Sequence, residues 1–552
     1  MFGAVAFMMG MVATASGSVI TEQMNAYKQI IGGDKLTADG LVKILQLHDS
    51  DTRCHGPCLK HIDNFVQGVD GVEWGKLGEL LEQIYGDSIS TDPYDPQEVH
   101  IALTDSLNEV KVMWATMESL SDPFVEYTAF DNEWSETTTM TSTAVQYTYT
   151  VPMNWYPVFA GWMYETNMEG LEAGKKRYKY RVGGYTSDGG AHKSQDFSFV
   201  TAPEPAAQQK TTFAMLGDQG TFMVLGFTVS AKIIQLQDEL GIDVVHYAGD
   251  LCYAGLSGDL TPFNGEDVDD EFGHIWDLWG IQNEPIAATR PFMTTPGNHE
   301  SFYNYTAFNN RYKMPFQKSK GNGNYWFSYD YGNVHIVSIS TEESFELGSP
   351  QMVWVEQDLA TAAANRDTVP WIVISMHRPM YTSEHDMDNT GARTVNMEAL
   401  VLQYDVDLVI QGHVHVYERV HPVSAGEVTV FPKKRPNGDG KLVDVYETEG
   451  KGPVYVTQGN TGAMQFERWE QPQPDWSAVR FANGYIPPHN PFRGGHRDEN
   501  QLGGAILESN YSDTFGFGVS TFFNSTHLHY RCIPVTGDVG VDEFWIVKRT
   551  NK

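Results

Sequence analysis

The chain has 552 residues, of which 41% are hydrophobic and 12% aromatic, so it can bury large cores and its length predicts more than one domain. This composition excludes a disordered protein. A formal net charge of −34 excludes nucleic acid and anionic membranes as partners, because both would be repelled. A phosphate ligand would be repelled too, so a phosphate site here needs strong local positive charge, such as bound metal ions.

Residues 1–18 form a short apolar run followed by small residues, and Ala13-Thr14-Ala15 fits a signal-peptidase site. We predict a removed secretory signal, because a membrane-spanning helix needs roughly 20 apolar residues. Secretion would place the protein outside the cell or in a vacuolar or lysosomal compartment. Three Asn-x-Ser/Thr sequons agree with a secreted glycoprotein, and they lie at Asn304, Asn510 and Asn524.

Residues 19–92 space their apolar side chains for one buried helical face, which predicts a helical extension to which we assign no role. Cys54 and Cys58 in this region either form a local bridge or remain two free thiols. Residues 93–203 instead carry short alternating runs separated by turn residues. This pattern predicts an antiparallel β-sandwich of fibronectin type III size.

Residues 203–210 are polar and contain two prolines, which is typical of a linker. From residue 211 to residue 552 buried apolar runs alternate with helical patterns, such as those of residues 227–240 and 271–288. Buried strands alternating with helices predict a layered α/β domain. The C-terminal tail of this domain is rich in strand patterns.

Five of the predicted strands end in side chains that bind metals, and ligands of α/β folds gather at the carboxyl ends of strands. Oxygen donors together with imidazoles suit iron, manganese or zinc. Cys252 lies among these residues, but the alternation of a strand end predicts a packed thiol. The candidate ligands are Asp218, Asp250, Tyr253, Asn298, His377, His413 and His415.

The motifs at these strand ends resemble, in order, the five signature blocks of the purple acid phosphatases. They are GDQG, GDLCY, GNHE, the His377 block SMHRPMY, and GHVH. The similarity runs from about Pro96 to Lys548 and includes the sandwich region, as in the large plant-type form. It implies a metallophosphoesterase fold, which is a four-layer α/β/β/α sandwich, behind an N-terminal antiparallel β-sandwich.

The resemblance also implies which side chains hold which ion. A ferric ion would be held by Asp218, Tyr253 and His415, a divalent ion (zinc, manganese or iron) by Asn298, His377 and His413, and Asp250 would bridge the two. Chemistry supports this division, because a phenol of pKa ~10 loses its proton in acid only beside a highly charged metal. Residues 253–255 read Tyr-Ala-Gly, which disfavours the protein Ser/Thr phosphatases with their Asp-Arg-Gly.

An acid phosphatase that hydrolyses small phosphate monoesters with a metal-bound hydroxide is the function that the resemblance predicts. His299 would act on the leaving group. His385 lies one position away from a histidine of the plant family, so its catalytic role stays open. The same centre would also suit a phytase, or a nucleotide phosphodiesterase or pyrophosphatase. From another class, we keep a wall- or glycan-binding protein with an inactive phosphatase domain; the oligomeric state stays open.

Other polar residues have simpler explanations. His246 and His335 lie within apolar runs and are predicted to be core histidines. His527 and His529 share a strand face and are predicted to be structural. Arg378 directly follows His377, and strand alternation predicts that its side chain turns away from the site.

Overall fold

The computed structural model describes residues 35–36, 72–73, 92–147, 161–221, 226–256, 270–271, 273–385, 387, 389, 391–463, 469–481, 515–535 and 542–548. The predicted signal, Cys54, Cys58 and Asn510 lie outside the described residues. Most of the predicted helical extension also lies outside them. Two short strands of that region are described, β1 (Lys35–Leu36) and β2 (Val72–Glu73), and they pair antiparallel.

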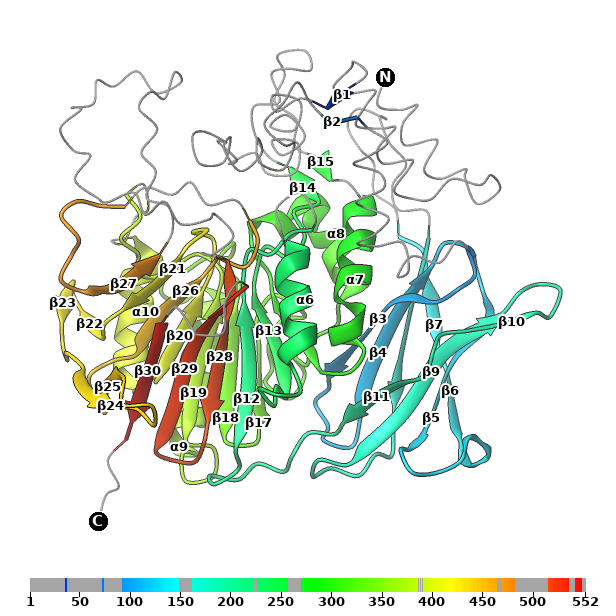
Figure 1. The fold of residues 1–552 in the computed structure, drawn as a ribbon, viewed down its shortest axis with the longest axis horizontal. Helices are drawn as coiled ribbons and strands as arrows, with labels where there is room; N and C mark the ends of the chain where they lie inside the picture. The colour runs from blue at the N-terminus through cyan, green and yellow to red at the C-terminus, as the bar shows by residue number, and fades with distance from the viewer. Residues whose placement is uncertain are drawn as a thin grey trace.

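An antiparallel β-sandwich follows, as the alternating runs predicted (Figure 1). One sheet has the order β3-β4-β8-β7, with β3 (Gln97–Leu103), β4 (Val110–Thr116), β8 (Trp162–Met168) and β7 (Thr143–Val145). The other has the order β10-β9-β5-β6, with β10 (Ala191–Lys193), β9 (Arg177–Tyr185), β5 (Ser121–Ala129) and β6 (Thr138–Thr141), and β11 (Phe197–Val200) also pairs with β9. Trp114 stacks on Tyr164 in the core between them, with 5.3 Å between ring centroids.

The larger domain is built on two mixed sheets. The eight-stranded sheet has the order β16 (Phe292–Thr295), β13 (Val244–Ala248), β12 (Thr211–Leu216), β28 (Gly516–Phe522), β29 (His527–Pro534), β30 (Asp542–Val547), β25 (Leu442–Tyr446) and β24 (Lys433–Pro436). The seven-stranded sheet has the order β17 (Phe327–Tyr331), β18 (Val334–Ile339), β19 (Trp371–Met376), β20 (Leu408–Gln411), β26 (Val454–Gln458), β21 (Tyr417–Val420) and β27 (Ser477–Phe481). Strands β12, β13 and β16 are parallel, as are β18, β19, β20 and β26, so each set ends at one edge of its sheet.

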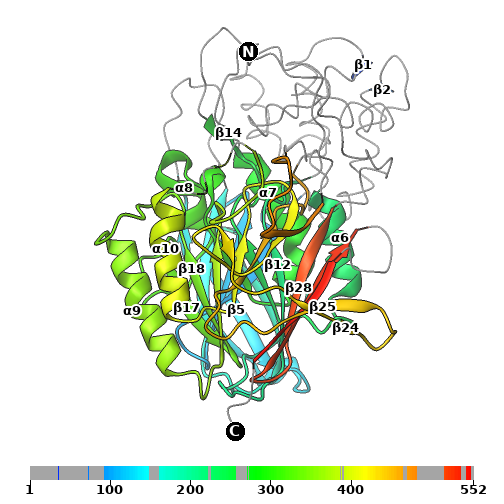
Figure 2. The ribbon, with the colours of Figure 1, turned by 90° about the vertical axis from the view of Figure 1, so that its left-hand side faces the viewer.

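Helices cover the outer faces of the two sheets. Figure 2 shows α9 (Pro350–Ala364) and α10 (Ala392–Gln403) on one side and α6 (Gly226–Leu236) on the other, with the strands between them. Among the described residues the larger domain also contains α7 (Gly273–Ala287) and α8 (Phe302–Arg311). This arrangement is the predicted four-layer α/β/β/α sandwich. Among the described residues, no helix combines the length and hydropathy that crossing a membrane requires.

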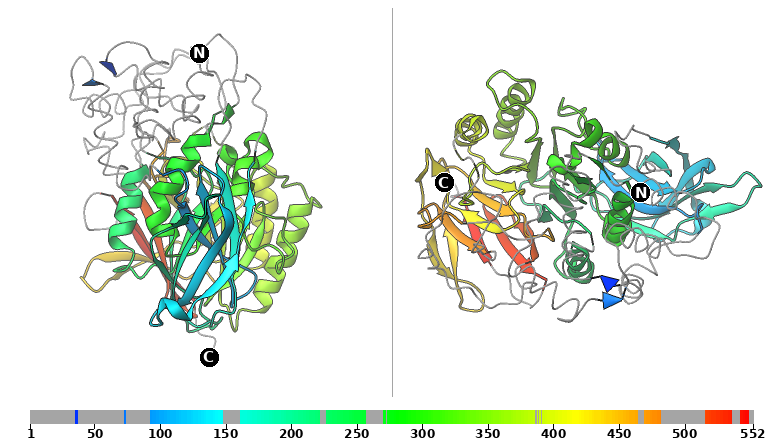
Figure 3. Two further views of the ribbon diagram at one scale, coloured as in Figure 1. Left: turned by 90° about the vertical axis from the view of Figure 1, so that its right-hand side faces the viewer. Right: turned by 90° about the horizontal axis from the view of Figure 1, so that it is seen from above.

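The β-sandwich packs against the larger domain, with β3 in contact with α7. Figure 3 shows the two parts side by side from two further directions. Arg311, at the end of α8, is buried at this junction, and its Nη1 lies 2.6 Å from Glu98 Oε2 on β3. The same guanidinium donates to Asp277 on α7 and, from Nε, to the Tyr147 hydroxyl 2.8 Å away. A buried cation with two carboxylate partners fixes the orientation of the junction, because separating them would leave charges unpaired.

Two histidines predicted to be core residues differ in charge. His246 is buried with its ring nitrogens 2.9 Å from the Tyr329 hydroxyl and 3.2 Å from Thr295 Oγ1, and burial lowers its pKa to about 3. His335 is also buried, but it lies between Asp330 and Asp358, 2.7 and 3.0 Å away. Burial alone would lower the pKa of His335, yet these two carboxylates raise it to about 9.

We expect His335→Gln to destabilise the protein by about 3 kcal/mol at pH 5 to 6. The folded-state pKa of about 9 lies above the ordinary value of 6.5, so the stabilisation is complete below 6.5 and is lost as the pH rises through 9. Urea unfolding of both proteins at pH 5.5 and pH 9.5 measures the difference. An equal loss at both pH values would contradict a charged His335, and His527→Gln on the exposed end of β29 is the control.

Candidate metal centre

The predicted ligands lie at the strand ends, on unusual backbone. Asp218 follows β12, Asp250 follows β13 and His413 follows β20, with φ of 59°, 49° and 69° respectively. Tyr253 also has a positive φ, of 59°. Left-handed conformations of non-glycine residues cost energy and cluster at functional sites, so these turns indicate a site that the fold holds in place.

Two glycines let the loops approach each other at this edge. A Cβ on Gly297 would lie 2.3 Å from Asp250 Oδ1, and one on Gly412 would lie 2.6 Å from Asp218 Oδ2. Any other residue would collide with these carboxylates, so glycine is required for the close approach.

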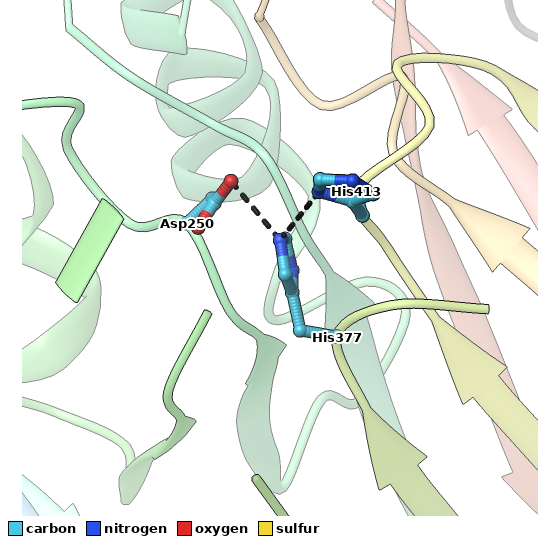
Figure 4. A group of neighbouring side chains, drawn as sticks. All are labelled: Asp250, His377 and His413. Atoms are coloured by element: carbon cyan, nitrogen blue, oxygen red, sulfur yellow. Dashed lines mark hydrogen bonds and ion pairs between the residues drawn. The ribbon is translucent and has the colours of Figure 1, made fainter. Parts of the chain in front are cut away.

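One cluster of donor atoms surrounds His377, which follows β19. Figure 4 shows Asp250, His377 and His413 pointing toward one another. His377 Nε2 lies 3.0 Å from Asp250 Oδ2, 3.1 Å from Asn298 Oδ1 and 3.2 Å from His413 Nδ1. His377 Nδ1 lies 2.9 Å from the Ala248 carbonyl and donates to it, so a neutral His377 presents the lone pair of Nε2 to this cluster.

A second cluster surrounds the Tyr253 hydroxyl, which lies 3.1 Å from Asp218 Oδ1 and 2.9 Å from His415 Nε2. His415 Nε2 and Asp218 Oδ1 are 3.6 Å apart. All three side chains are buried. The structure thus sorts the seven predicted side chains into two neighbouring groups, with Asp250 in the first and in contact with both His377 and His299.

The electrostatics of the site fit cations. Burial raises the pKa of Asp218 to about 6. Burial alone would lower the pKa of His377, but Asp250 beside it raises that pKa to about 9, so in the absence of a cation the cluster takes up a proton. A site that demands positive charge and offers carboxylate, amide, phenol and imidazole donors suits iron, manganese or zinc.

Two residues inside the motifs support the ligand loops, although the sequence alone gave them no role. Glu300 is buried and accepts hydrogen bonds from the backbone N–H groups of Asp250, Leu251 and Gly297, at 2.8 to 2.9 Å. Gln219, next to Asp218, is buried and accepts hydrogen bonds at Oε1 from Tyr247, Trp279 and Asn283. In the sequence, only their position beside predicted ligands pointed to these two residues. Apart from Gly297, their partners come from distant segments.

The two predicted catalytic histidines occupy different surroundings. The His299 ring lies 4.5 Å from the Tyr253 ring, its backbone N–H donates to Asp250 Oδ1, and it is buried at the site. His385 lies in an exposed turn after Glu384, which pairs with Trp469. Cys252 is a buried free thiol, as predicted.

The prediction for Arg378 is wrong. Its side chain does not turn away: Nη1 lies 2.9 Å from His413 Nε2. The loop after β18 draws it toward the site, because Glu342 binds the guanidinium through Nε at 2.9 Å. The prediction from strand alternation failed because Arg378 lies beyond the end of β19, where side chains no longer alternate between the two faces of the sheet.

The protein has two layered sheets, two clusters of donor atoms where their parallel strands end, and a β-sandwich before them. These features define its class as a metallophosphoesterase with an N-terminal domain. The family described as calcineurin-like phosphoesterase matches residues 223–417, and the purple acid phosphatase N-terminal domain matches residues 96–201. A purple acid phosphatase of Glycine max is 30% identical over 470 residues, which cover 82% of this chain and 86% of that protein. The chain belongs to the purple acid phosphatase family.

Further relatives agree with this assignment. A phosphoenolpyruvate phosphatase of Allium cepa is 29% identical over 407 residues, covering 71% of this chain and 76% of the relative. The structure of a purple acid phosphatase from yellow lupin (Lupinus luteus) seeds shares the fold, with a TM-score of 0.65, 21% identity, and coverage of 83% of this chain and 75% of that one. The protein is therefore a hydrolase, an acid phosphatase with a binuclear metal centre.

Proposed function

We propose that the two donor clusters hold two different ions. The ligands of a ferric ion are Asp218, Tyr253 and His415, those of a divalent zinc, manganese or iron ion are Asn298, His377 and His413, and Asp250 joins both. The observation that carries this proposal is the sorting of the donors: the one phenol lies with a carboxylate and an imidazole, apart from the two imidazoles around Asn298. A phenol favours the more highly charged ion.

Held by these residues, two metal ions would lower the pKa of a coordinated water and offset the charge of the phosphate. The chain itself positions these groups: Glu300 fixes the backbone of the Asp250 turn, and the buried surroundings of Asp218 and Asp250 exclude bulk water. We assign the protonation of the leaving group to His299, which is buried beside Tyr253, and His385 is a second candidate for this role. Small phosphate monoesters are the proposed substrates. The relative from Allium cepa, named phosphoenolpyruvate phosphatase, supports that class of substrate.

Secretion and glycosylation belong to the same proposal. Asn304 is exposed, with φ of 57°, and is open to a glycan. Asn524 is half-buried, and its Oδ1 accepts from the N–H groups of Thr526 and His527. We therefore propose Asn304, rather than Asn524, as the occupied sequon of the two described ones.

Tyr253→Phe tests the ion assignment. We expect purified wild-type protein to contain iron and a second metal and to absorb visible light, because a phenolate bound to iron(III) donates charge to it. The variant should lose this band and bind iron more than about 10-fold more weakly, while unfolding at a similar temperature. Metal analysis, a visible spectrum and a thermal melt measure these three quantities.

Two results would contradict the assignment. One is a folded, active wild-type protein without a transition metal, or one that keeps its full rate after chelation. The other is an unchanged visible band in Tyr253→Phe. The matched control is Tyr381→Phe, because Tyr381 is also buried and donates its hydroxyl proton to a carboxylate, Glu398, at 2.5 Å.

A further inference from the structure

Arg378 brings a positive charge to the edge of the proposed divalent-ion site. Its Nη1 lies 2.9 Å from His413 Nε2, and its Nε and Nη2 lie 2.9 and 3.3 Å from the two carboxylate oxygens of Glu342. The Arg378 side chain is 30% exposed, whereas the His377 side chain beside it is fully buried. The guanidinium therefore lies between the buried centre and the solvent from which a substrate arrives.

The contact with His413 matches donor to acceptor only in one tautomer. A guanidinium has donors and no acceptor, so His413 Nε2 must accept, which places the proton of a neutral His413 ring on Nδ1. His413 Nδ1 is the atom that faces His377. If Nδ1 binds a metal ion through its lone pair, the proton of the neutral ring must lie on Nε2 instead. Two donors then face each other across the 2.9 Å contact.

An acceptor placed at this edge removes the conflict. A phosphate oxygen accepts from several donors at once, and arginine is the side chain best suited to bind phosphate in two places. Glu342 already holds the opposite edge of the guanidinium, and the Arg378 backbone N–H donates to Thr341 Oγ1 at 3.0 Å. The backbone and one edge of the guanidinium are thus held in place while Nη1 is directed toward the site.

We propose that Arg378 binds the phosphate group of the substrate, and that Glu342 is the positioning residue that orients it. This inference rests on the proposed ligand role of His413. It is also consistent with the charge of the chain, because a net charge of −34 repels a phosphate anion until local cations reverse the field. Arg378 adds one such cation at the rim of the centre, outside the ligand set.

The test compares Arg378→Gln and Arg378→Lys with wild-type holoenzyme. Inorganic phosphate is titrated calorimetrically, and its inhibition constant is measured against p-nitrophenyl phosphate. We expect Arg378→Gln to weaken phosphate binding about 10- to 100-fold and to raise KM more than it lowers kcat, with metal content unchanged. Arg378→Lys should lie between the two, because lysine keeps the charge but not the planar fork.

Arg181→Gln is the matched control. Arg181 pairs with Glu126 in the β-sandwich, and the side chains of that pair are 25% and 18% exposed, against 30% and 17% for Arg378 and Glu342. Unchanged phosphate affinity in Arg378→Gln with full metal content would overturn the proposal. Loss of metal from that variant would overturn it too, by showing that Arg378 supports His413 instead. Absence of metal from the wild type would contradict the ligand assignment itself, which is a separate result.

Discussion

Asp250→Asn is expected to lower kcat for phosphate monoester hydrolysis by roughly 10³-fold. Asp250 Oδ2 lies 3.0 Å from His377 Nε2, and Asp250 Oδ1 accepts a hydrogen bond from the backbone N–H of His299. The same carboxylate therefore contacts a proposed metal ligand and the proposed general acid. Asparagine keeps the shape but removes the negative charge that binds cations. Steady-state kinetics at acidic pH and metal analysis measure the two losses.

A control for this variant lies at the other end of β13. Asp243 precedes β13, at the opposite end from Asp250, and pairs with Lys175 at 2.9 Å. Asp243→Asn should keep its metals and nearly all of its activity. If Asp250→Asn retained two ions and at least a tenth of the wild-type rate, Asp250 would not be a bridging ligand.

Arg311→Met is expected to destabilise the protein by about 3–5 kcal/mol, because it leaves the buried Glu98 and the partly buried Asp277 without their cation. Glu98 Oε2 lies 2.6 Å from the guanidinium, and Asp277 contacts its other terminal nitrogen. Arg311 and Glu98 are nearly fully buried, so water cannot replace the lost partner. Denaturant unfolding, followed by fluorescence and by phosphatase activity, measures the loss and shows whether both domains unfold together.

Replacing all three charged residues of this junction distinguishes the effect of an unpaired charge on stability from the effect of lost packing. The triple variant Arg311→Met, Glu98→Gln and Asp277→Asn should recover a large part of the stability lost in the single variant, since no buried charge is left unpaired. Arg290→Met is the control, because the Asp238 partner of Arg290 is 93% exposed. A single variant as stable as this control would contradict an ionic junction between the β-sandwich and α7.

The strands that carry the site could be predicted from the sequence because their information is local. The buried runs before Asp218, Asp250, Asn298, His377 and His413 form β12, β13, β16, β19 and β20, as expected. Each run is apolar throughout, as a strand covered on both faces must be, and a polar residue follows it directly. The order of the motifs then identified the family, which the comparisons confirm.

The supporting groups could not be predicted, because the residues that complete them are far apart in the chain. Glu98 and Arg311 are 213 residues apart, and Glu300 and the Asp250 turn that it fixes are 50 apart. A buried charge needs a partner within hydrogen-bond distance, but the sequence does not say which segment supplies it.

The sequence by itself thus determined which side chains end the strands, and with them the family and the class of reaction. The family resemblance also gave the expected division of the donors between two ions. Only the tertiary structure decided which way Arg378 faces and which distant side chains hold the ligand turns. The physical reason is that strand formation depends on neighbouring residues, whereas the contacts of Arg378 with Glu342 and His413 depend on how three separate loops meet at one edge of the sheets.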